Sequence, residues 1–229
     1  MYENYFFLKL RSLARKTGLL KTIGNLLAKS DYEFLFKKAI LSRIAPSDCV
    51  YDIGANRGFY TQKFLEKTPQ GKVFAFEPVP ECNQVIQQLS GTSKHLFLNQ
   101  MEVGSSKGVV PMSIGTDVLN ATSTIKNQKN ENDIMVEIDT IDNIVSYNKS
   151  VPNVLKIDVE GFELEVIKGM KETLKNSTVQ VIAMEIHFSS MEKMGYQYGP
   201  KEIVDVLKTN KFRVKWIDAS HIIALRGRK

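Results

Sequence analysis

Hydrophobic positions along this chain follow two alternating patterns. Short apolar runs at 50–54, 72–77 and 95–100 predict buried strands. The amphipathic runs between them, at 59–67 and 81–90, predict helices. Strands and helices that alternate in this way form right-handed crossovers and a mostly parallel α/β sheet with helices on both faces. A ligand of such a sheet binds at the carboxyl ends of the strands.

The C-terminal half continues this alternation and then changes it. Apolar runs at 154–158 and 179–187 predict two further parallel strands, with a helix near 162–174 between them. The last predicted elements are a helix at 201–209 and a hairpin of two short strands at 212–217 and 222–225.

The N-terminal residues, 1–45, precede the alternation. Their apolar residues have helical spacing, and Asp31 is the expected N-cap of a helix that ends near Ile44. The first part is basic, so we expect a helical cap on the domain, a contact between copies of the chain, or an interfacial helix on an anionic membrane. The basic residues are Lys9, Arg11, Arg15 and Lys16.

Residues 46–229 are expected to form one domain, and residues 104–139 interrupt its pattern. Two short predicted strands, at 109–114 and 134–138, enclose a polar, Asn-rich stretch. A long polar loop in a compact domain is usually either functional or disordered.

The turn after the first strand gives the main indication of a ligand. Gly54 and Gly58 lack a Cβ, so the turn accommodates positive φ and lets a ligand lie against backbone N–H groups at a helix N-terminus. Asp52 precedes the first glycine. Glu77 closes the second strand about 20 residues further on, where a carboxylate can bind both hydroxyls of a ribose. The spacing G-x-x-x-G argues against the dinucleotide fingerprint G-x-G-x-x-G.

Four motifs in sequence order resemble those of the FkbM-like methyltransferases. The resemblance runs from about Val50 to about His187 and continues more weakly to the C-terminus. It implies S-adenosylmethionine as the cofactor and methylation of hydroxyl groups on sugars or natural products. It also implies the class I Rossmann-like methyltransferase fold, a mostly parallel seven-stranded sheet in which the C-terminal hairpin supplies an antiparallel edge. The motifs are Tyr51-Asp52-Ile53-Gly54-Ala55-Asn56-x-Gly58, Phe76-Glu77-Pro78-x-Pro80, Leu155-Lys156-Ile157-Asp158-Val159-Glu160-Gly161 and Glu185-Ile186-His187.

The resemblance also assigns residues to the cofactor. In the family the third strand ends beside the adenine, so Asn99 and Gln100 take that position here, although the acidic residue usual there is absent. The resemblance favours a substrate-side flap for residues 104–139. The residues expected to bind S-adenosylmethionine are Asp52, Gly54, Asn56, Gly58, Thr61, Glu77, Pro78, Asn99, Gln100 and Asp158.

Charged residues at the ends of the fourth and fifth parallel strands indicate the chemistry. The family's strand order would bring four side chains together beside the methyl group: Asp158, Glu160, Glu185 and His187. His187 could be a general base that Asp158 or Glu185 orients, or the three could hold Mg²⁺ or another hard cation. Lys156 could pair with one of the carboxylates or extend from an edge strand towards solvent. In the purely structural alternative, Asp158 and Glu160 only cap the next helix.

Composition narrows the functional class only slightly. The chain has 229 residues, of which 43% are hydrophobic and 24% charged, as in an ordinary soluble globular protein. The net charge of +6 permits an anionic partner without selecting one. No N/D-P-P-Y/F motif occurs, so we expect a small-molecule or glycan acceptor and no nucleic acid. The two cysteines, the absence of a secretory signal and the lack of a spanning apolar stretch predict a cytoplasmic protein.

Two other functional classes stay open. An NAD-type Rossmann oxidoreductase also uses a glycine turn and an acid on the second strand, but the third glycine of its fingerprint is missing. A non-catalytic module could bind a membrane or an enzyme complex through the basic N-terminal helices, but the acids at the strand ends argue against it. The acceptor, the metal dependence and the oligomeric state do not follow from the sequence.

Overall fold

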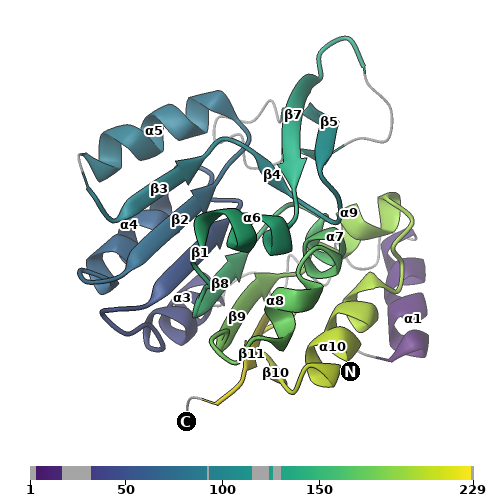
Figure 1. Ribbon diagram of the computed structural model, residues 1–229. Coiled ribbons are helices and arrows are strands. Elements are labelled where there is room, and N and C mark those ends of the chain that lie inside the picture. Colours follow the sequence, from purple (N-terminus) through teal and green to yellow (C-terminus); the bar gives the residue numbers. More distant parts are fainter. Residues whose placement is uncertain (1–3, 17–31, 92, 115–123, 126–129, 228–229) are drawn as a thin grey trace.

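The strand that precedes the glycine turn, β1 (Cys49–Ile53), lies in the middle of a seven-stranded sheet. The computed structural model describes residues 4–16, 32–91, 93–114, 124–125 and 130–227. Within these ranges, helices cover both faces of the sheet, as the alternation of strands and helices predicts (Figure 1).

The order of the strands in the sheet is β10-β11-β9-β8-β1-β2-β3. β1 therefore lies between the second and the fourth parallel strands, as the resemblance implies. β11 is antiparallel to both of its neighbours, so the predicted hairpin is present, with its second strand inside the sheet and its first at the edge. The other strands are β2 (Lys72–Phe76), β3 (Leu96–Asn99), β8 (Val154–Ile157), β9 (Val181–Glu185), β10 (Arg213–Trp216) and β11 (His221–Leu225).

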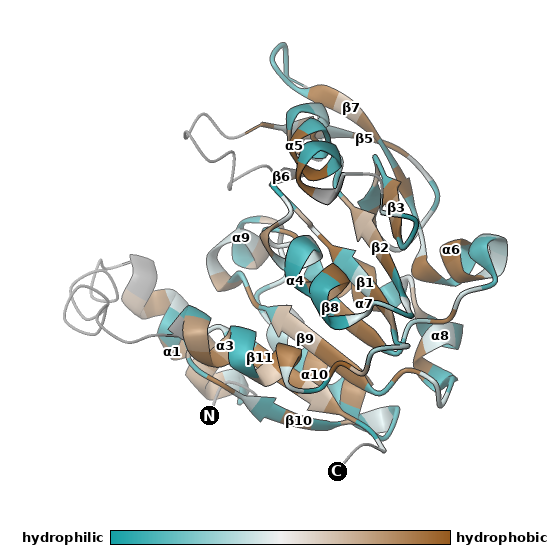
Figure 2. Ribbon diagram, turned by 90° about the vertical axis from the view of Figure 1, so that its left-hand side faces the viewer, coloured by the Kyte–Doolittle hydropathy of each residue, from teal (hydrophilic) through white to brown (hydrophobic). Residues whose placement is uncertain are grey.

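Alternation along the strands explains why both faces of the sheet are covered. In β1, Tyr51 and Ile53 face one side and Val50 the other, and none of the three is exposed. The first side packs against α6 (Ile141–Asn148), α7 (Glu163–Lys168), α8 (Lys171–Lys175) and α10 (Gly199–Thr209). The second side packs against α3 (Tyr32–Leu41) and α4 (Phe59–Lys67), and α5 (Pro80–Ser90) covers Ala75 of β2. The central strands, which are buried on both faces, are mainly hydrophobic (Figure 2). Asp52 in β1 and Lys156 in β8 are charged exceptions.

The helices differ from the prediction in three places. The helix expected near 162–174 is divided into α7 and α8 at Gly169, where a Cβ would lie 1.9 Å from the carbonyl oxygen of Gly104. The backbones of Gly104 and Gly169 are in contact there, and the first helix ends. The structure also has α6 and α9 (Phe188–Lys193), which the apolar spacing did not predict. The helix expected to reach Ile44 ends at Leu41, and Asp31 lies outside the described residues.

The segment that interrupts the alternation forms a second, smaller sheet above the carboxyl ends of the main strands (Figure 1). The two predicted strands are present as β5 (Gly108–Ser113) and β7 (Ile134–Asp139), which pair antiparallel. β4 (Glu102–Val103) and β6 (Thr124–Ile125) extend the sheet on its two sides. Residues 115–123 and 126–129 of the expected flap lie outside the described residues.

The N-terminal helix α1 (Tyr5–Lys16) packs against α9 and the start of α10. Leu8 is 3% exposed, and the Ser12 hydroxyl donates a hydrogen bond of 2.6 Å to Glu192. The Arg11 guanidinium lies 4.0 Å from the centre of the Phe188 ring. Because Phe188 directly follows His187, α1 supports the chain segment that leaves the candidate site.

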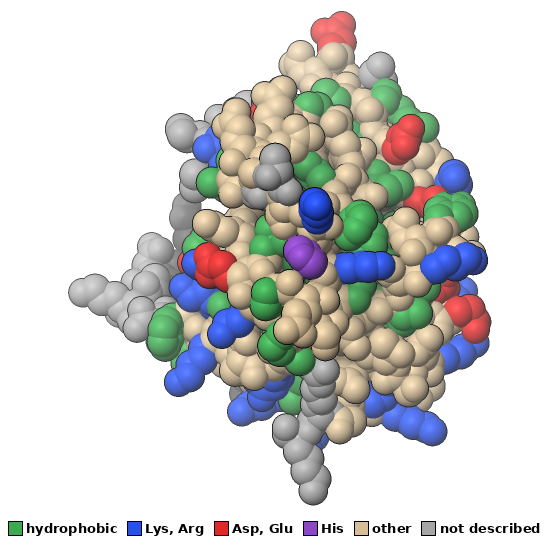
Figure 3. Space-filling model, turned by 60° about the vertical axis from the view of Figure 1, so that its left-hand side comes forward, with side chains coloured by type: hydrophobic (Ala, Val, Ile, Leu, Met, Phe, Trp, Pro, Cys, Tyr) green, Lys and Arg blue, Asp and Glu red, His purple; other side chains and the backbone are tan. Residues whose placement is uncertain are grey.

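Charge is distributed unevenly between the surface and the interior. On the face shown in Figure 3, lysine and arginine side chains lie dispersed among uncharged ones, with fewer acids between them. Several of the acids are instead buried, including Asp52, Glu77, Glu102 and Glu163. Among the described residues, no helix is long and apolar enough to cross a membrane.

Candidate active site

A cavity of about 280 Å³ lies at the carboxyl ends of β2, β1, β8 and β9. It is bordered on one side by the small sheet, through Glu102 and Met112. Five of the eleven residues that line it carry a carboxyl group, so the cavity is rich in acids although the net charge of the protein is positive. The lining residues are Gly54, Asn56, Glu77, Pro78, Glu102, Met112, Asp158, Val159, Glu160, Glu185 and His187.

The glycine turn brings β1 and β8 into direct contact. Gly54 has φ +73°, and a Cβ on it would lie 1.8 Å from the carbonyl oxygen of Asp158. Gly58, with φ +81°, stands at the start of α4. Only glycine can occupy position 54 without moving the end of β8, so the turn and the first carboxylate of the cluster are positioned together.

Glu77 holds the turn as well as lining the cavity. Its Oε2 accepts a hydrogen bond of 2.7 Å from the backbone N–H of Asn56, and its Oε1 one of 2.9 Å from that of Val79. The side chain is 6% exposed, and burial raises its pKa although the two N–H groups oppose the rise. Each oxygen has a second lone pair, so the carboxylate retains acceptors for a ribose.

Asp52, Thr61 and Lys156 support the turn from below and do not line the cavity. The Thr61 hydroxyl donates a 2.6 Å hydrogen bond to Asp52, which is completely buried. Lys156 Nζ donates to the Gly54 carbonyl at 2.8 Å and lies 3.5 Å from Asp52 and 3.2 Å from Asp158. Burial opposes the charge of Lys156, but the two carboxylates outweigh it and raise its pKa. Lys156 therefore pairs with carboxylates, as one interpretation predicts. The other interpretation, in which it extends from an edge strand towards solvent, is wrong because β8 lies inside the sheet.

The residues expected at the adenine end do not reach the cavity. Asn99 ends β3, and its side-chain amide donates to the Phe97 carbonyl at 3.1 Å. Neither Asn99 nor Gln100 lines the cavity, whereas Glu102 does. Glu102 could not be predicted from the sequence. It lies on β4, where the chain leaves β3 and enters the small sheet, and a strand of two residues is too short to show a pattern.

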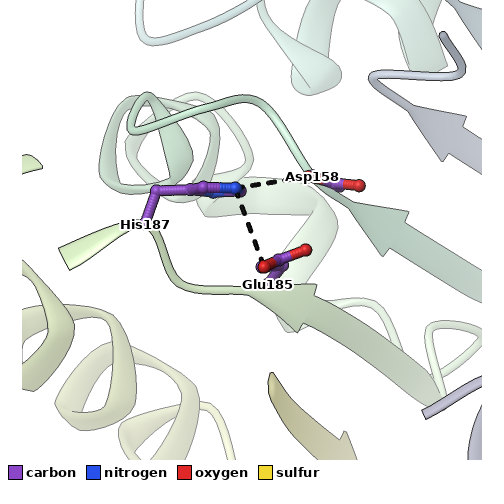
Figure 4. Close-up of side chains that lie close together, drawn as sticks. All are labelled: Asp158, Glu185 and His187. Carbon is purple, nitrogen blue, oxygen red and sulfur yellow. Dashed lines mark ion pairs between the residues drawn. The ribbon is translucent and has the colours of Figure 1, made fainter. Parts of the chain in front are cut away.

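Asp158, Glu185 and His187 do come together, from the tips of β8 and β9 (Figure 4). His187 Nε2 lies 3.8 Å from Asp158 Oδ1 and 3.8 Å from Glu185 Oε1. Glu160 adds a further carboxylate oxygen at 3.4 Å. The cluster lies next to the Gly54 turn in the same cavity.

The sequence predicts that Asp158 or Glu185 orients the His187 ring if it acts as a base, but in the structure a different residue does so. The ring Nδ1 lies 2.6 Å from Oε1 of Glu163, a completely buried residue at the start of α7. Burial alone would lower the pKa of His187, but Glu163 and the other carboxylates raise it to about 10. Glu163 lies two residues beyond the end of the third motif, at Gly161, and a glutamate at a helix N-terminus has a simpler explanation in sequence as a favourable charge there.

His221 is a further member of the site that the sequence did not indicate. It stands opposite Glu185 in the pairing of β11 with β9, and its Nε2 lies 3.3 Å from Glu185 Oε2. Its Nδ1 lies 2.8 Å from Asp218. Only the antiparallel insertion of β11 beside β9 brings His221 to the site.

Comparison with known proteins agrees with this geometry. The profile of the Methyltransferase FkbM domain matches residues 52–214, from β1 to β10. Hexuronic acid methyltransferase AglP of Haloferax volcanii is 29% identical over 176 residues, which cover 76% of this chain and 67% of AglP. 2-O-methyltransferase NoeI of Sinorhizobium fredii is 25% identical over 179 residues, which cover 71% of this chain and 72% of NoeI.

Solved structures show the same fold at low sequence identity. SMU.1697c of Streptococcus mutans, in complex with S-adenosylhomocysteine, has a TM-score of 0.54 and 9% identity, covering 86% of this chain and 98% of its own. An rRNA methylase from Streptococcus thermophilus has a TM-score of 0.51 and 10% identity, covering 86% and 95%. The profile match covers the glycine turn, Glu77 and the whole cluster, and it displaces the oxidoreductase interpretation. The chain belongs to the FkbM family of S-adenosylmethionine-dependent methyltransferases.

Proposed function

We propose that this methyltransferase transfers a methyl group to a hydroxyl of a sugar, a glycan or a natural product. The observation that carries the proposal is the position of Asp158, Glu185 and His187 beside the Gly54 turn, in one cavity. A neutral hydroxyl is a poor nucleophile, so its methylation needs groups that remove its proton or lower its pKa. The similarity to AglP, a hexuronic acid methyltransferase, and to NoeI, a 2-O-methyltransferase, supports a sugar-type acceptor.

The cofactor is proposed to lie along the carboxyl ends of the strands. Gly54 and Asn56 would face its amino-acid part, Glu77 its ribose, and Pro78 and Glu102 its adenine end. This arrangement leaves the methyl group towards Asp158 and the tip of β9. Gly54 and Asn56 leave room for the amino-acid end of an elongated ligand, and Glu77 offers acceptors for the hydroxyls in its middle.

In the reaction, the acceptor oxygen attacks the methyl carbon in line with the departing sulfur. The new C–O bond forms as the C–S bond breaks, and the electron pair of that bond stays on the sulfur. The hydroxyl proton must leave the oxygen. Two routes fit the cluster. His187 would accept the proton in its neutral form, which the neighbouring carboxylates disfavour because they raise its pKa to about 10. Alternatively, Asp158, Glu185 and His187 would hold Mg²⁺ or another divalent cation, which would lower the pKa of the hydroxyl so that its proton passes to water.

The test is methyl transfer from labelled S-adenosylmethionine to a panel of hydroxylated acceptors, starting with uronic acids and oligosaccharides. His187→Ala is expected to lower kcat by about 10²-fold or more, with affinity for S-adenosylhomocysteine within a few-fold of the wild type. Equal loss of cofactor binding would show that His187 belongs to the cofactor site. Methylation of amines with no methylation of hydroxyls would contradict the proposal.

We also propose roles for the parts outside the central fold. Residues 46–229 would be the methyltransferase domain, and the small sheet with the segment near 104–139 would contact the acceptor. Residues 1–45 would form a cap whose outer side rests on an anionic membrane. Phe6 and Leu10 support this role: they are 74% and 51% exposed, and they are four residues apart on α1. α1 also carries cations and no acid.

Sedimentation with vesicles tests the membrane contact. The wild type is expected to sediment with vesicles that contain phosphatidylserine and to stay in solution with neutral phosphatidylcholine vesicles. The double substitution Phe6→Ser and Leu10→Ser should abolish sedimentation while affinity for S-adenosylhomocysteine stays unchanged. A different outcome would assign this face to a second copy of the chain: a wild type that is dimeric and does not bind vesicles, and a doubly substituted variant that is monomeric.

A further inference from the structure

The imidazole of His187 is held so that one nitrogen faces the cavity. Its Nδ1 lies 2.6 Å from Oε1 of Glu163, and the same oxygen accepts a hydrogen bond of 3.0 Å from the backbone N–H of Gly161. A carboxylate only accepts hydrogen bonds, so Nδ1 carries the proton in this pair. The lone pair of a neutral ring is then on Nε2, which faces Asp158 and Glu185. Histidines that bind metals in proteins are fixed by a carboxylate in this way.

The two carboxylates are held in the same manner. Asp158 Oδ2 lies 3.2 Å from Lys156 Nζ, and Glu185 Oε2 lies 3.3 Å from His221 Nε2. In both side chains the other oxygen, Oδ1 or Oε1, faces His187 (Figure 4). Lys156 stands on β8 and His221 on β11, so strands of the same sheet set the orientation of both carboxylates.

The three facing atoms converge without bonding to one another. His187 Nε2 is 3.8 Å from each of the two oxygens, beyond hydrogen-bonding distance. Two ligands that lie about 2.1 Å from one metal ion are separated by at most about 4.2 Å, so both distances fit ligands of a shared ion. The ligand atoms of all three residues lie within 4.8 Å of one another, so the two carboxylate oxygens would have to approach by at most about 0.6 Å to share the ion.

We propose that Asp158, Glu185 and His187 bind one divalent transition-metal ion of the Mn²⁺ type. An imidazole among the donors makes Mg²⁺ the poorer fit, because Mg²⁺ in proteins takes oxygen ligands and keeps several waters. Three protein ligands leave coordination positions open, as in catalytic metal sites. The inference rests on the proposed function only for the role of the ion, which is to bind the acceptor oxygen and lower the pKa of its hydroxyl; the proton then passes to water.

Metal binding can be measured without any acceptor. Purified full-length protein is titrated with MnCl₂ while the electron paramagnetic resonance signal of free Mn²⁺ is followed, with and without S-adenosylhomocysteine. One ion per chain is expected. Glu185→Gln should weaken Mn²⁺ binding by about 100-fold or more. Glu163→Gln, which changes the shared partner of His187 and of the Gly161 N–H, should weaken it by about 10-fold to 100-fold. Mg²⁺ should displace Mn²⁺ only at large excess.

Glu172→Gln is the control. It removes an exposed acid that pairs with Lys175 and does not line the cavity, and it should leave Mn²⁺ affinity within twofold. Glu185→Gln decides the outcome if Glu163→Gln fails to fold, because the Glu185 side chain is 31% exposed and tolerates an isosteric change. The absence of Mn²⁺ binding, or equal affinity in wild type and Glu185→Gln, would overturn the metal site and leave methyl transfer to hydroxyls intact. Mn²⁺ binding without transfer to any hydroxyl would uphold the site and overturn the proposed acceptor.

Discussion

At the scale of single residues, Glu102 has the most unusual environment of the acids in the cavity. Its side chain is 5% exposed, and its one hydrogen bond in the described structure comes from the backbone N–H of Val103, at 2.9 Å. Burial, with Glu77 and Glu163 nearby, raises its pKa from 4.5 to about 8. At neutral pH the side chain is therefore mainly the uncharged acid, which can donate a hydrogen bond as well as accept one.

The raised pKa of Glu102 predicts a pH dependence of stability. The folded chain holds this proton up to about pH 8, whereas the unfolded chain loses it near pH 4.5, so its contribution to stability falls as pH rises through that window. Between about pH 5 and about pH 8 the loss is on the order of 3 kcal/mol. Glu102→Gln removes it. Urea unfolding at both pH values should show the variant gaining stability relative to the wild type at the higher pH; an unchanged difference would refute the raised pKa.

A second prediction at this scale concerns Glu77. Glu77→Gln replaces an acceptor oxygen with an amide NH₂ that faces a backbone N–H, of Asn56 or of Val79. The lost hydrogen bond costs about 1 to 3 kcal/mol. The affinity for S-adenosylhomocysteine, measured by calorimetry, should fall by about 10-fold or more. Asn99→Ala is the control, because Asn99 does not line the cavity; an equal loss in both variants would place the ribose elsewhere.

At the scale of elements, the junction between β1 and β8 constrains the site most tightly. Gly54→Ala would combine φ +73° with a Cβ 1.8 Å from the Asp158 carbonyl oxygen, and backbone atoms cannot move aside as a flexible side chain can. Gly91 provides a control, because it has φ +55° and nothing within 4 Å of its Cβ position. Thermal unfolding should show a cost of about 1 kcal/mol for Gly91→Ala and several-fold more for Gly54→Ala. Similar costs would mean that the junction is adaptable.

The elements that the sequence predicts are those whose burial is set by their own pattern. β1, β2, β8 and β9 are apolar because both faces are covered, and α4 and α10 have one apolar side each. The short helices α6 and α9 and the strands β4 and β6 have too few residues to show a period. Their existence depends on contacts with distant segments, such as Gly104 against Gly169.

The candidate site divides in the same way. Asp158, Glu185 and His187 are predictable because polar residues at the ends of apolar strands stand out, and neighbouring parallel strands end at one edge. Their partners are not predictable by this route. Glu163 lies on a helix, and His221 reaches Glu185 only through the antiparallel position of β11. Glu102 arrives through the small sheet. The sequence pattern thus identifies the groups that face the ligand, and the fold supplies the groups that orient them.

At the scale of the whole molecule, the cavity spans the ends of four central strands, so a bound cofactor should stabilise the entire domain. A ligand that binds only the folded state at 100 times its Kd adds about 2.7 kcal/mol to the free energy of unfolding. For a chain of 229 residues this corresponds to a rise in Tm of about 5 to 10 °C. S-adenosylhomocysteine should produce this rise in a thermal scan, and Glu77→Gln should reduce it at the same ligand concentration. NAD should produce none, because the turn lacks the G-x-G-x-x-G spacing that holds the pyrophosphate of a dinucleotide. A rise with NAD and none with S-adenosylhomocysteine would contradict the assignment of this cavity to the methyl donor.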